Sequence, residues 1–539
     1  MKKGSVTVLL ALVFPAVLAL VLTVIEAARF GGVRLKARDA GNAAVDSILA
    51  GYNRDLLDEY GLLFYDGSFG SGMIDYAKIE EEFLQYFQDN TDARGLLSGG
   101  SLLPVGATKA EIANIVTATD YNGGIFIRSA LDYFKYDAVG ELTDKIREYV
   151  DEIIKGDDLK AQSDKSQGML EETDWGKSGE VENERNQNFD HPGSPLAIKT
   201  LELHRRVNER DTDFSEGQDG FERVLPMDQA GTSGNAFDRD RFDKQIAGSP
   251  IGDAATVKKG LWLSLVFPAN TGLSGYELNT EEAPSHIAVD KRELNDEGFL
   301  NDAANVVLFN EYLMKNYASF TDKSEKSGAK YEVEYLIYGK SKDSDNLKTV
   351  LNRIMWIREG INLIYLMSSN HMSEAEAAAS ALFSWTTNPL IIKLAQLALV
   401  AAWAYGEAIL DVRALLEGKR IDFIKNDDNW MLSFQNLPMV FRGGRVQTKE
   451  SKNGLCYEDY LRILLYLTDI HMSAYRAMDL IQNKVREKAP DFLMESQIYA
   501  VEFRTECRAR ALFASLPVVK NEVRKGTNYQ WEEYFSEVY

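Results

Sequence analysis

The sequence predicts an α+β protein, in which an N-terminal transmembrane helix precedes a large mixed extracytoplasmic domain that is helix-rich in its C-terminal half. Three patterns predict this class. An apolar run without a charged residue extends from Val6 to Ile25. Apolar residues recur at three- and four-residue spacing in many later segments, which is typical of helices with one buried face. Between Tyr499 and Cys507, apolar residues alternate with charged ones, as in a strand with one buried face.

The apolar run near the N-terminus has the length of a membrane-spanning helix. Its residues number about twenty and rise about 1.5 Å each, enough to cross a hydrocarbon core about 30 Å thick. Two lysines precede the run and predict a cytoplasmic N-terminus, although the basic residues from Arg29 to Arg38 oppose that orientation. A cleaved secretory signal is the alternative, but a cut after Ala28 would put charged Glu26 at a small-residue position. We predict a retained single-pass anchor over residues 1–30.

Composition excludes some classes of protein. The 539 residues carry a net charge of −22 and a pI near 4.9. Nucleic acid is not an expected partner, because a phosphate-binding surface needs clustered Lys and Arg. The two cysteines, Cys456 and Cys507, are too few for a disulfide framework. They can form one bridge in an oxidising space or remain two thiols.

Residues 31–155 form a predicted membrane-proximal α+β region. Glycines 31 and 32 predict a bend, because glycine is a weak helix former. The elements expected after it are a helix over 45–60, a helix over 75–87, a loop over 95–106, a strand over 112–119 and helix over 127–154. Residues 156–253 are polar and poor in large apolar side chains, which indicates a linker or insertion with one short helix over 201–207.

Residues 254–539 form a predicted helix-rich α+β domain. Strands are expected over 261–267, 331–338 and 499–507. Helices are expected over 347–361, 374–384, 390–416 and 457–488, with Ser373 and Glu376 as a capping box for the second of these. The helix over 390–416 is the most apolar internal segment, but Lys393 and Gln396 interrupt it, which favours a buried core helix over a second membrane span.

No catalytic or cofactor motif is evident, so we expect no catalytic residue, no cofactor and no bound metal. The five histidines are scattered, which argues against a zinc hydrolase. The stretch from Asp66 to Gly70 lacks the last hydroxyl of a metal-binding adhesion motif and predicts a turn. Asp343 and Asp345 are interpreted as helix-capping residues. Glu407 and Asp411, four residues apart on one apolar helix, predict structural ion pairing in the neighbourhood of Arg413.

The N-terminal segment GSVTVLLALVFP, Gly4 to Pro15, is followed by Glu26 and Arg29. Together they resemble the N-terminus of the TadE/TadG-like pseudopilins of tight-adherence (Tad) pilus systems. Three further segments look like a family of larger, poorly characterised Tad-like membrane proteins: 52–66, 401–421 and 454–467. Pro15 removes one backbone donor from the membrane helix and predicts a kink, which fits the resemblance, although membrane helices also tolerate proline.

The resemblance implies a non-enzymatic structural component of a Tad-like type IV pilus or secretion assembly. A prepilin peptidase would cut between Gly4 and Ser5, and the apolar helix would then pack against other pilin-like subunits or a Tad-type platform in the lipid bilayer. Leu9 departs from the pattern, because typical relatives carry a glutamate at the fifth position after the cut. The alternative function is an extracytoplasmic enzyme or ligand-binding protein that an ordinary signal anchor tethers.

Overall fold

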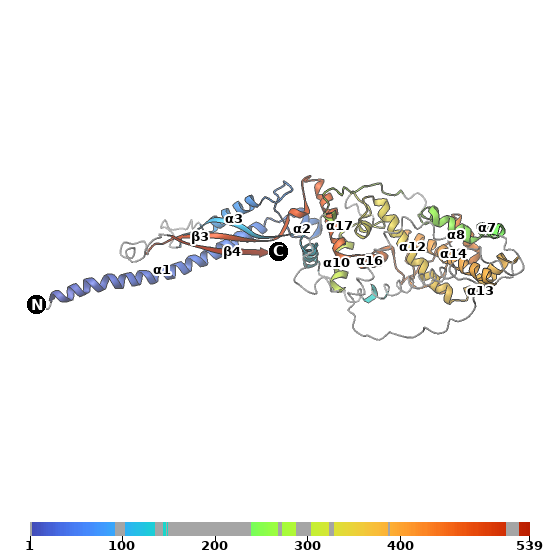
Figure 1. The fold of residues 1–539 in the computed structure, drawn as a ribbon, viewed down its shortest axis with the longest axis horizontal. Coiled ribbons are helices and arrows are strands. Elements are labelled where there is room, and N and C mark those ends of the chain that lie inside the picture. The colour runs from blue at the N-terminus through green and yellow to red at the C-terminus, as the bar shows by residue number, and fades with distance from the viewer. Residues whose placement is uncertain are drawn as a thin grey trace, which may run out of the picture. The chain divides into compact units, whose positions relative to one another are not determined.

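A computed structural model describes residues 3–91, 103–134, 144–146, 148, 239–267, 272–286, 303–322, 328–385, 389–513 and 528–539. The chain divides into two compact units. Unit 1 comprises Met1–Lys135, Glu282–Asn295 and Met478–Tyr539; unit 2 comprises Tyr136–Glu281 and Asp296–Ala477. The predicted α+β class is confirmed, since helices are combined with one small antiparallel sheet (Figure 1). Most of the predicted polar linker, including its short helix over 201–207, lies outside the described residues.

Unit 1 begins with one long helix, α1 (Lys3–Leu49), which contains Pro15. The bend predicted at glycines 31 and 32 is wrong, because α1 continues through both. Small side chains let this part of the helix approach the rest of unit 1 closely, among them the buried Ala37 and Ala44. At Gly41 the approach is so close that a methyl group would overlap the ring of Phe535. Burial of this face offsets the weak helix propensity of the glycines.

The predicted helix over 45–60 is two helices. After α1 ends at Leu49, a short turn leads into α2 (Arg54–Tyr60). The side chain of Asn53 accepts hydrogen bonds from the N–H groups of Asp55 and Leu56 and so caps α2. Gly61 ends the helix with a φ of +69°, a left-handed conformation that glycine adopts without a steric penalty.

The sheet of unit 1 has β3 (Gln497–Arg510) at its centre. β2 (Val105–Thr117) pairs with it antiparallel on one side; β1 (Tyr65–Asp66) and β4 (Asn528–Val538) pair with it on the other. The strands predicted over 112–119 and 499–507 are confirmed as parts of β2 and β3. α3 (Tyr76–Thr91) confirms the helix expected over 75–87.

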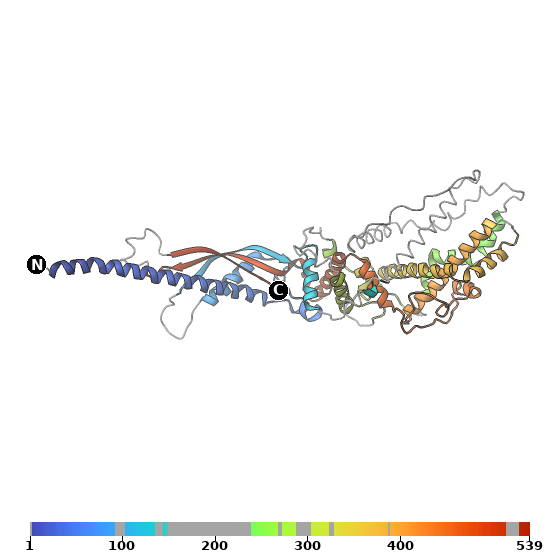
Figure 2. The same cartoon turned by 90° about the horizontal axis from the view of Figure 1, so that it is seen from below.

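α1 and α3 lie on the same face of the sheet (Figure 2). Their apolar side chains form a core with the inward residues of the strands. Phe83 of α3 stacks on Phe503 of β3, with ring centroids 4.3 Å apart, and also contacts Phe535 of β4. The opposite face of β3 carries exposed charged residues such as Arg504 and Glu506, which explains the alternation in the sequence. Unit 1 also contains α4 (Gly124–Tyr133) and the 3-10 turns η4 (Pro284–His286) and η6 (Met494–Ser496).

The described part of unit 2 consists of helices and loops. The longest helices, α12 (Asp343–Ser368) and α14 (Pro389–Leu416), pack against each other, and α13 (His371–Leu382) packs on α14. The remaining helical elements are α7 (Arg239–Ala247), α8 (Pro250–Thr256), the π-helical turn η3 (Val257–Leu261), α9 (Trp262–Val266), α10 (Ala303–Asn316), α11 (Glu332–Tyr338), η5 (Phe434–Asn436), α15 (Leu437–Phe441), α16 (Tyr457–Leu467) and α17 (Ile470–Arg486), whose last turns belong to unit 1.

Several predicted elements of unit 2 are wrong. The segments 261–267 and 331–338 are helical, not extended. Residues 332–337 are all buried, so their apparent alternation does not report one wet and one dry face. The helix predicted over 457–488 is interrupted near Asp469, whose carboxylate accepts from the N–H groups of two residues in α17, His471 and Met472. The capping box at Ser373 is absent, because α13 begins earlier, at His371.

The buried core helix expected over 390–416 is confirmed as α14, and the helix expected over 347–361 is confirmed as part of α12. α14 ends before Gly418, whose φ of +79° is left-handed. The helical segment expected over 127–154, which the sequence favours as two helices, is confirmed in α4 as far as Tyr133 and again at residues 144–146 and 148, which are helical. The rest of it lies outside the described residues.

Candidate functional site

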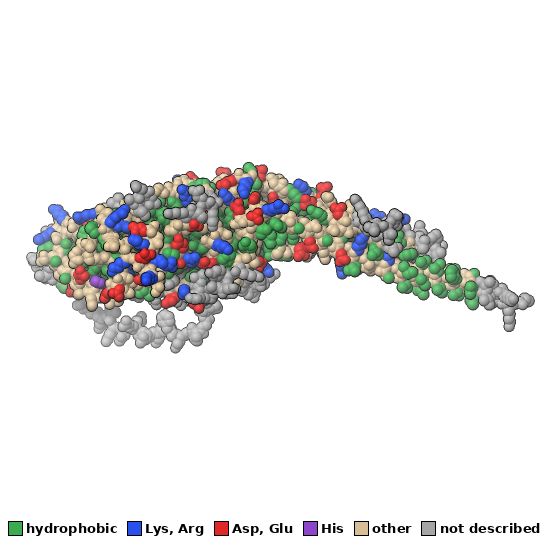
Figure 3. Space-filling model, turned by 180° about the vertical axis from the view of Figure 1, so that it is seen from behind, with side chains coloured by type: hydrophobic (Ala, Val, Ile, Leu, Met, Phe, Trp, Pro, Cys, Tyr) green, Lys and Arg blue, Asp and Glu red, His purple; other side chains and the backbone are tan. Residues whose placement is uncertain are grey.

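The N-terminal part of α1 exposes a continuous apolar surface. Between Leu9 and Ile25 the large side chains are exposed except for the half-buried Leu22, and Leu12 reaches 73%. The apolar patch on this part of α1 is visible at the right of Figure 3. Among the described residues, α1 is the one helix long and apolar enough to cross a membrane. The predicted features Gly4, Ser5 and Pro15 all lie in this part of the helix.

Glu26 and Arg29 lie where the exposed part of α1 gives way to the buried part. They form an ion pair of 2.6 Å, and both side chains are buried. Arg29 also donates from Nη2 to the carbonyl oxygen of Arg510 at 2.7 Å. The carboxylate of Glu26 accepts from the N–H of Phe513 at 2.8 Å and from that of Leu512 at 3.4 Å. The pair therefore fastens α1 to the chain at the end of β3.

Glu26 and Arg29 were singled out in the sequence through the resemblance, and not as an ion pair. Opposite charges three residues apart on a helix can meet on one face, and these two do. The sequence offered no signal for the backbone groups at residues 510–513, which are more than 480 positions away.

A second cluster of charged residues is buried in unit 2. Glu407 and Asp411 project from α14, Arg358 from α12, and Lys425 from the loop after α14. Lys425 Nζ lies 2.6 Å from Glu407 and 2.7 Å from Asp411, and Arg358 Nε lies 2.9 Å from Asp411. Burial opposes ionisation of Asp411, but the two neighbouring cations hold the pKa of its carboxyl below the ordinary value. Two positive and two negative groups thus compensate one another.

The ion cluster also fixes the loop over 422–432. Arg358 donates from Nη1 to the carbonyl oxygen of Phe423 at 2.7 Å, and Glu407 accepts from the N–H of Leu432 at 2.8 Å. The structural role predicted for Glu407 and Asp411 fits these contacts. Arg413 is not their partner, because it donates instead to the carbonyl oxygens of Leu265 and Gly444.

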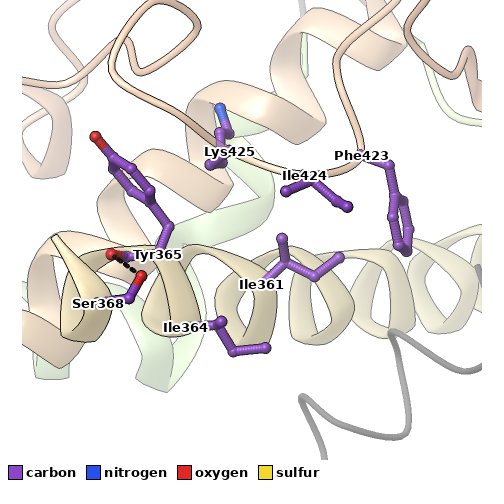
Figure 4. Close-up of a pocket in the computed structure, with 7 residues that line it drawn as sticks. All are labelled: Ile361, Ile364, Tyr365, Ser368, Phe423, Ile424 and Lys425. Atoms are coloured by element: carbon purple, nitrogen blue, oxygen red, sulfur yellow. Dashed lines mark hydrogen bonds between the residues drawn. The ribbon is translucent and has the colours of Figure 1, made fainter.

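A small hollow of about 100 Å³ lies beside this cluster. Its walls are mainly apolar, and they include Ile361, Ile364 and Ile424 (Figure 4). Lys425 contributes its carbon chain to the hollow, but its ammonium group points away, toward the carboxylates of α14. The charge of Lys425 is therefore used inside the protein and is not offered to a ligand in the hollow.

The other sequence candidates have structural partners. Asp66 accepts from the backbone N–H and the hydroxyl of Ser68, which confirms the predicted turn. Asp343 accepts from the hydroxyl of Ser274 and the N–H of Lys330, so its role is to fasten a neighbouring loop and not to cap α12. The part of the chain that the structure describes contains no group of three or more His, Cys, Asp or Glu side chains that could hold a metal.

Both cysteines are free thiols in the structure, which answers the question that the sequence left open. Burial raises the pKa of Cys456 to about 12 and has the same effect on Cys507. A thiol of such low acidity is a poor nucleophile at neutral pH, because the thiolate is the reactive form. Cys507 is buried as a small apolar side chain, whereas Cys456 is half-buried and its thiol donates to the carboxylate of Asp459.

Sequence reasoning missed Arg358 and Lys425 of the buried cluster, and it also missed a buried carboxyl group, Glu334 in α11. Its Oε1 accepts from the N–H of Phe320 and from the hydroxyl of Tyr457, whereas its buried Oε2 has no partner among the described residues. Burial raises the pKa of this carboxyl to about 7. No spacing rule marks it, because only the tertiary structure removes it from water.

Replacement of Glu334 by Gln should change how stability depends on pH. The pKa of Glu334 is higher in the folded state, so folding favours the neutral form, and stability falls as pH rises from about 4.5 to about 7. The difference between a pKa of about 4.5 in the unfolded state and about 7 in the folded state corresponds to about 3 kcal/mol. Unfolding measured from pH 4 to pH 8 should find the E334Q variant more stable than the parent at pH 8, and the two profiles should converge near pH 4. Parallel profiles would contradict this assignment. The variant Glu417→Gln, at a partly exposed position, is the control.

The fold and the sites define an α+β protein with one N-terminal helix that is long and apolar enough to span a membrane. Residues 241–509 match a family of unknown function, DUF5702. The matched range contains all four charged residues of the ion cluster in unit 2 and nearly all of β3. No curated protein and no solved structure matches the chain.

Proposed function

We propose that this protein is a membrane-anchored structural subunit of a Tad-like pilus or secretion assembly, with its large domain outside the membrane. The observation that carries the proposal is the division of α1 into two parts. From Leu9 to Ile25 nearly all of its large apolar side chains are exposed; from Glu26 onward one face of the helix is buried in unit 1. An exposed apolar surface of this extent needs a lipid or protein environment.

The division of α1 supports a subunit that is held by its helix and presents a folded domain at a fixed distance from the membrane. The Glu26–Arg29 pair connects the end of the apolar part to β3, so the domain begins directly where the apolar part ends. The charged cluster of unit 2 supports a structural role in place of an enzymatic one, because its carboxylates and cations form ion pairs with one another inside the protein. The resemblance of Gly4–Pro15 to Tad pseudopilins is the reason for proposing a Tad-like assembly in particular.

Co-purification tests the proposed assembly. The protein, extracted from its native membranes in a mild detergent, should carry pilin-like subunits or a Tad-type platform with it. Its first residue, read by N-terminal sequencing, should be Ser5 if a prepilin peptidase has cut after Gly4. An intact N-terminus would remove the processing step from the proposal. A protein that runs solely as a monomer, without such partners, would contradict the assembly role.

Replacement of Val17 by Asp tests the anchor. Val17 lies in the exposed apolar part of α1, and a carboxylate at the centre of a membrane helix costs about 2.5–3.5 kcal/mol. We expect the share of protein that remains in carbonate-washed membranes to fall at least about tenfold. Leu35→Asp is the matched control, since Leu35 is also exposed, at 62%, but lies beyond Arg29 on the same helix. Equal loss in both variants would show that the apolar part is not the anchor.

A further inference from the structure

The outer edge of β4 is open. β4 pairs with β3 through eleven consecutive residues, from Asn528 opposite Arg510 to Val538 opposite Ala500. In the part of the chain that the structure describes, β4 has no strand on its other side. In an antiparallel ladder alternate residues direct their N–H and C=O groups to each neighbour, so about every second residue of β4 turns both groups outward.

The opposite edge of the sheet, formed by β2, is protected against the addition of another strand, unlike the outer edge of β4. β2 has three register irregularities along β3, near Lys109, Asn114 and Thr117. Such bulges hinder the addition of another strand. In addition, the carboxylate of Glu80 accepts from the N–H of Ile112 at 2.9 Å and so occupies a backbone donor of β2. The register of β4 with β3 has no irregularity.

Two exposed arginines of α1 flank the open edge. Residues of a helix are spaced about 100° apart, so Arg34 and Arg38 share one flank of α1 and Lys36 lies on the other. Lys36 donates to the carbonyl oxygen of Thr91 on α3, whereas Arg34 and Arg38 reach Glu533 of β4, at 3.6 and 2.7 Å. The two guanidinium groups share this one carboxylate and remain 46% and 61% exposed. An excess positive charge therefore lies beside the edge, on its helix-facing side.

We propose that the outer edge of β4 receives an extended strand of a partner protein, and that this strand carries a carboxylate on the side that faces α1. Backbone hydrogen bonds to β4 would supply the affinity, and the pairing of the carboxylate with Arg34 and Arg38 would supply the selectivity. This interaction surface is separate from the apolar part of α1, so it stands whether or not the Tad assembly is correct.

A second copy of this chain does not fit the edge. A two-fold antiparallel pairing of two β4 strands would turn the two α1 helices in opposite directions, which is incompatible with two anchors in one membrane on the proposed function. Pairing of β4 with β2 of another copy would meet the edge that Glu80 and the bulges protect.

A defined peptide tests the proposal. The probe is a fluorescent eight-residue Thr peptide with a single Glu near its centre, titrated into the full-length protein in detergent. One matched peptide has Lys in place of Glu, and another carries N-methyl groups on every second amide. We expect the Glu peptide to bind, the Lys peptide to bind more weakly, and the N-methylated peptide not to bind. Hydrogen exchange should show alternate amides of β4 exchanging rapidly alone and slowly with the Glu peptide.

Two variants distinguish binding of the peptide at the β4 edge from nonspecific attraction to positive charge. Arg38→Gln should weaken binding of the Glu peptide by about two- to fivefold, the range of an exposed ion pair. Arg504→Gln should leave it unchanged, because Arg504 pairs with Glu532 on the opposite face of the sheet. Undiminished binding of the N-methylated peptide, or absence of new protection in β4, would overturn the proposal. So would a peptide-free protein that light scattering shows to be a dimer with every amide of β4 protected.

Discussion

Replacement of Lys425 by Met is expected to lower the free energy of unfolding by about 3–5 kcal/mol, the cost of breaking a buried ion pair. The substitution keeps much of the side-chain volume but removes the ammonium group that lies between Glu407 and Asp411. Arg358 is then the one cation left for two buried carboxylates in this cluster. The loop over 422–432 should loosen as well, because Glu407 holds it through the N–H groups of Met431 and Leu432.

Urea unfolding followed by tryptophan fluorescence measures this effect. Trp430 is a local reporter, because its ring centre lies 5.8 Å from Lys425 Nζ. The control is Lys419→Met, which removes an ammonium group paired with Glu417 nearer the surface and should cost less than about 1 kcal/mol. Adding Glu407→Gln to Lys425→Met should recover part of the lost stability, since it removes one of the uncompensated charges. Equal costs for the two lysines would contradict the structural role of the cluster.

The second large effect is expected from Glu26→Ala in unit 1. The substitution leaves the guanidinium of Arg29 without its carboxylate and the N–H of Phe513 without its acceptor. We expect a loss of about 3 kcal/mol in the stability of unit 1, since a buried cation then lacks its counterion. α1 should also become less firmly held at the end of β3.

Hydrogen exchange of the Phe513 amide reports this change directly, because that amide should exchange faster in the variant. Glu506→Ala is the control: it also removes one carboxylate, but from the exposed face of β3. Arg29→Met tests the other half of the pair and should also free the segment after Arg510. Unchanged protection of Phe513 in Glu26→Ala would show that the ion pair does not hold this junction.

The sequence predicted the elements whose burial is one-sided. α3 and β3 each have one wet and one dry face, so their apolar residues repeat with the period of a helix or a strand. The strand predicted where α11 lies was wrong for the opposite reason. In α11, Glu332 and Glu334 are buried along with the apolar residues beside them, so a polar side chain in this helix does not mark an exposed position. Their alternation therefore imitates a strand.

The candidate sites were predictable only as far as local spacing reaches. Glu407 and Asp411 could be marked as structural ion-pairing residues, because they lie four residues apart on one helix. Glu26 and Arg29 were marked only through the resemblance, although their spacing of three allows the ion pair that they form. The more distant partners of both groups could not be predicted. Lys425 comes from a loop and Phe513 from beyond β3, and both are placed by tertiary packing alone. Arg413 was assigned to the cluster for its proximity in sequence, although its side chain turns to other carbonyl groups.

The contact between Glu26 and Phe513 joins residues 487 positions apart, and this separation has a consequence for biosynthesis. During translation α1 is made before unit 2, whereas β3 and β4, on which α1 docks, are made after most of unit 2. Unit 1 therefore cannot fold until β3 and β4 have been synthesised, although most of unit 2 is complete by then. Until that point the small-residue face of α1 has no sheet to pack against. A nascent chain truncated before β3 contains the apolar part of α1 but cannot complete the core of unit 1.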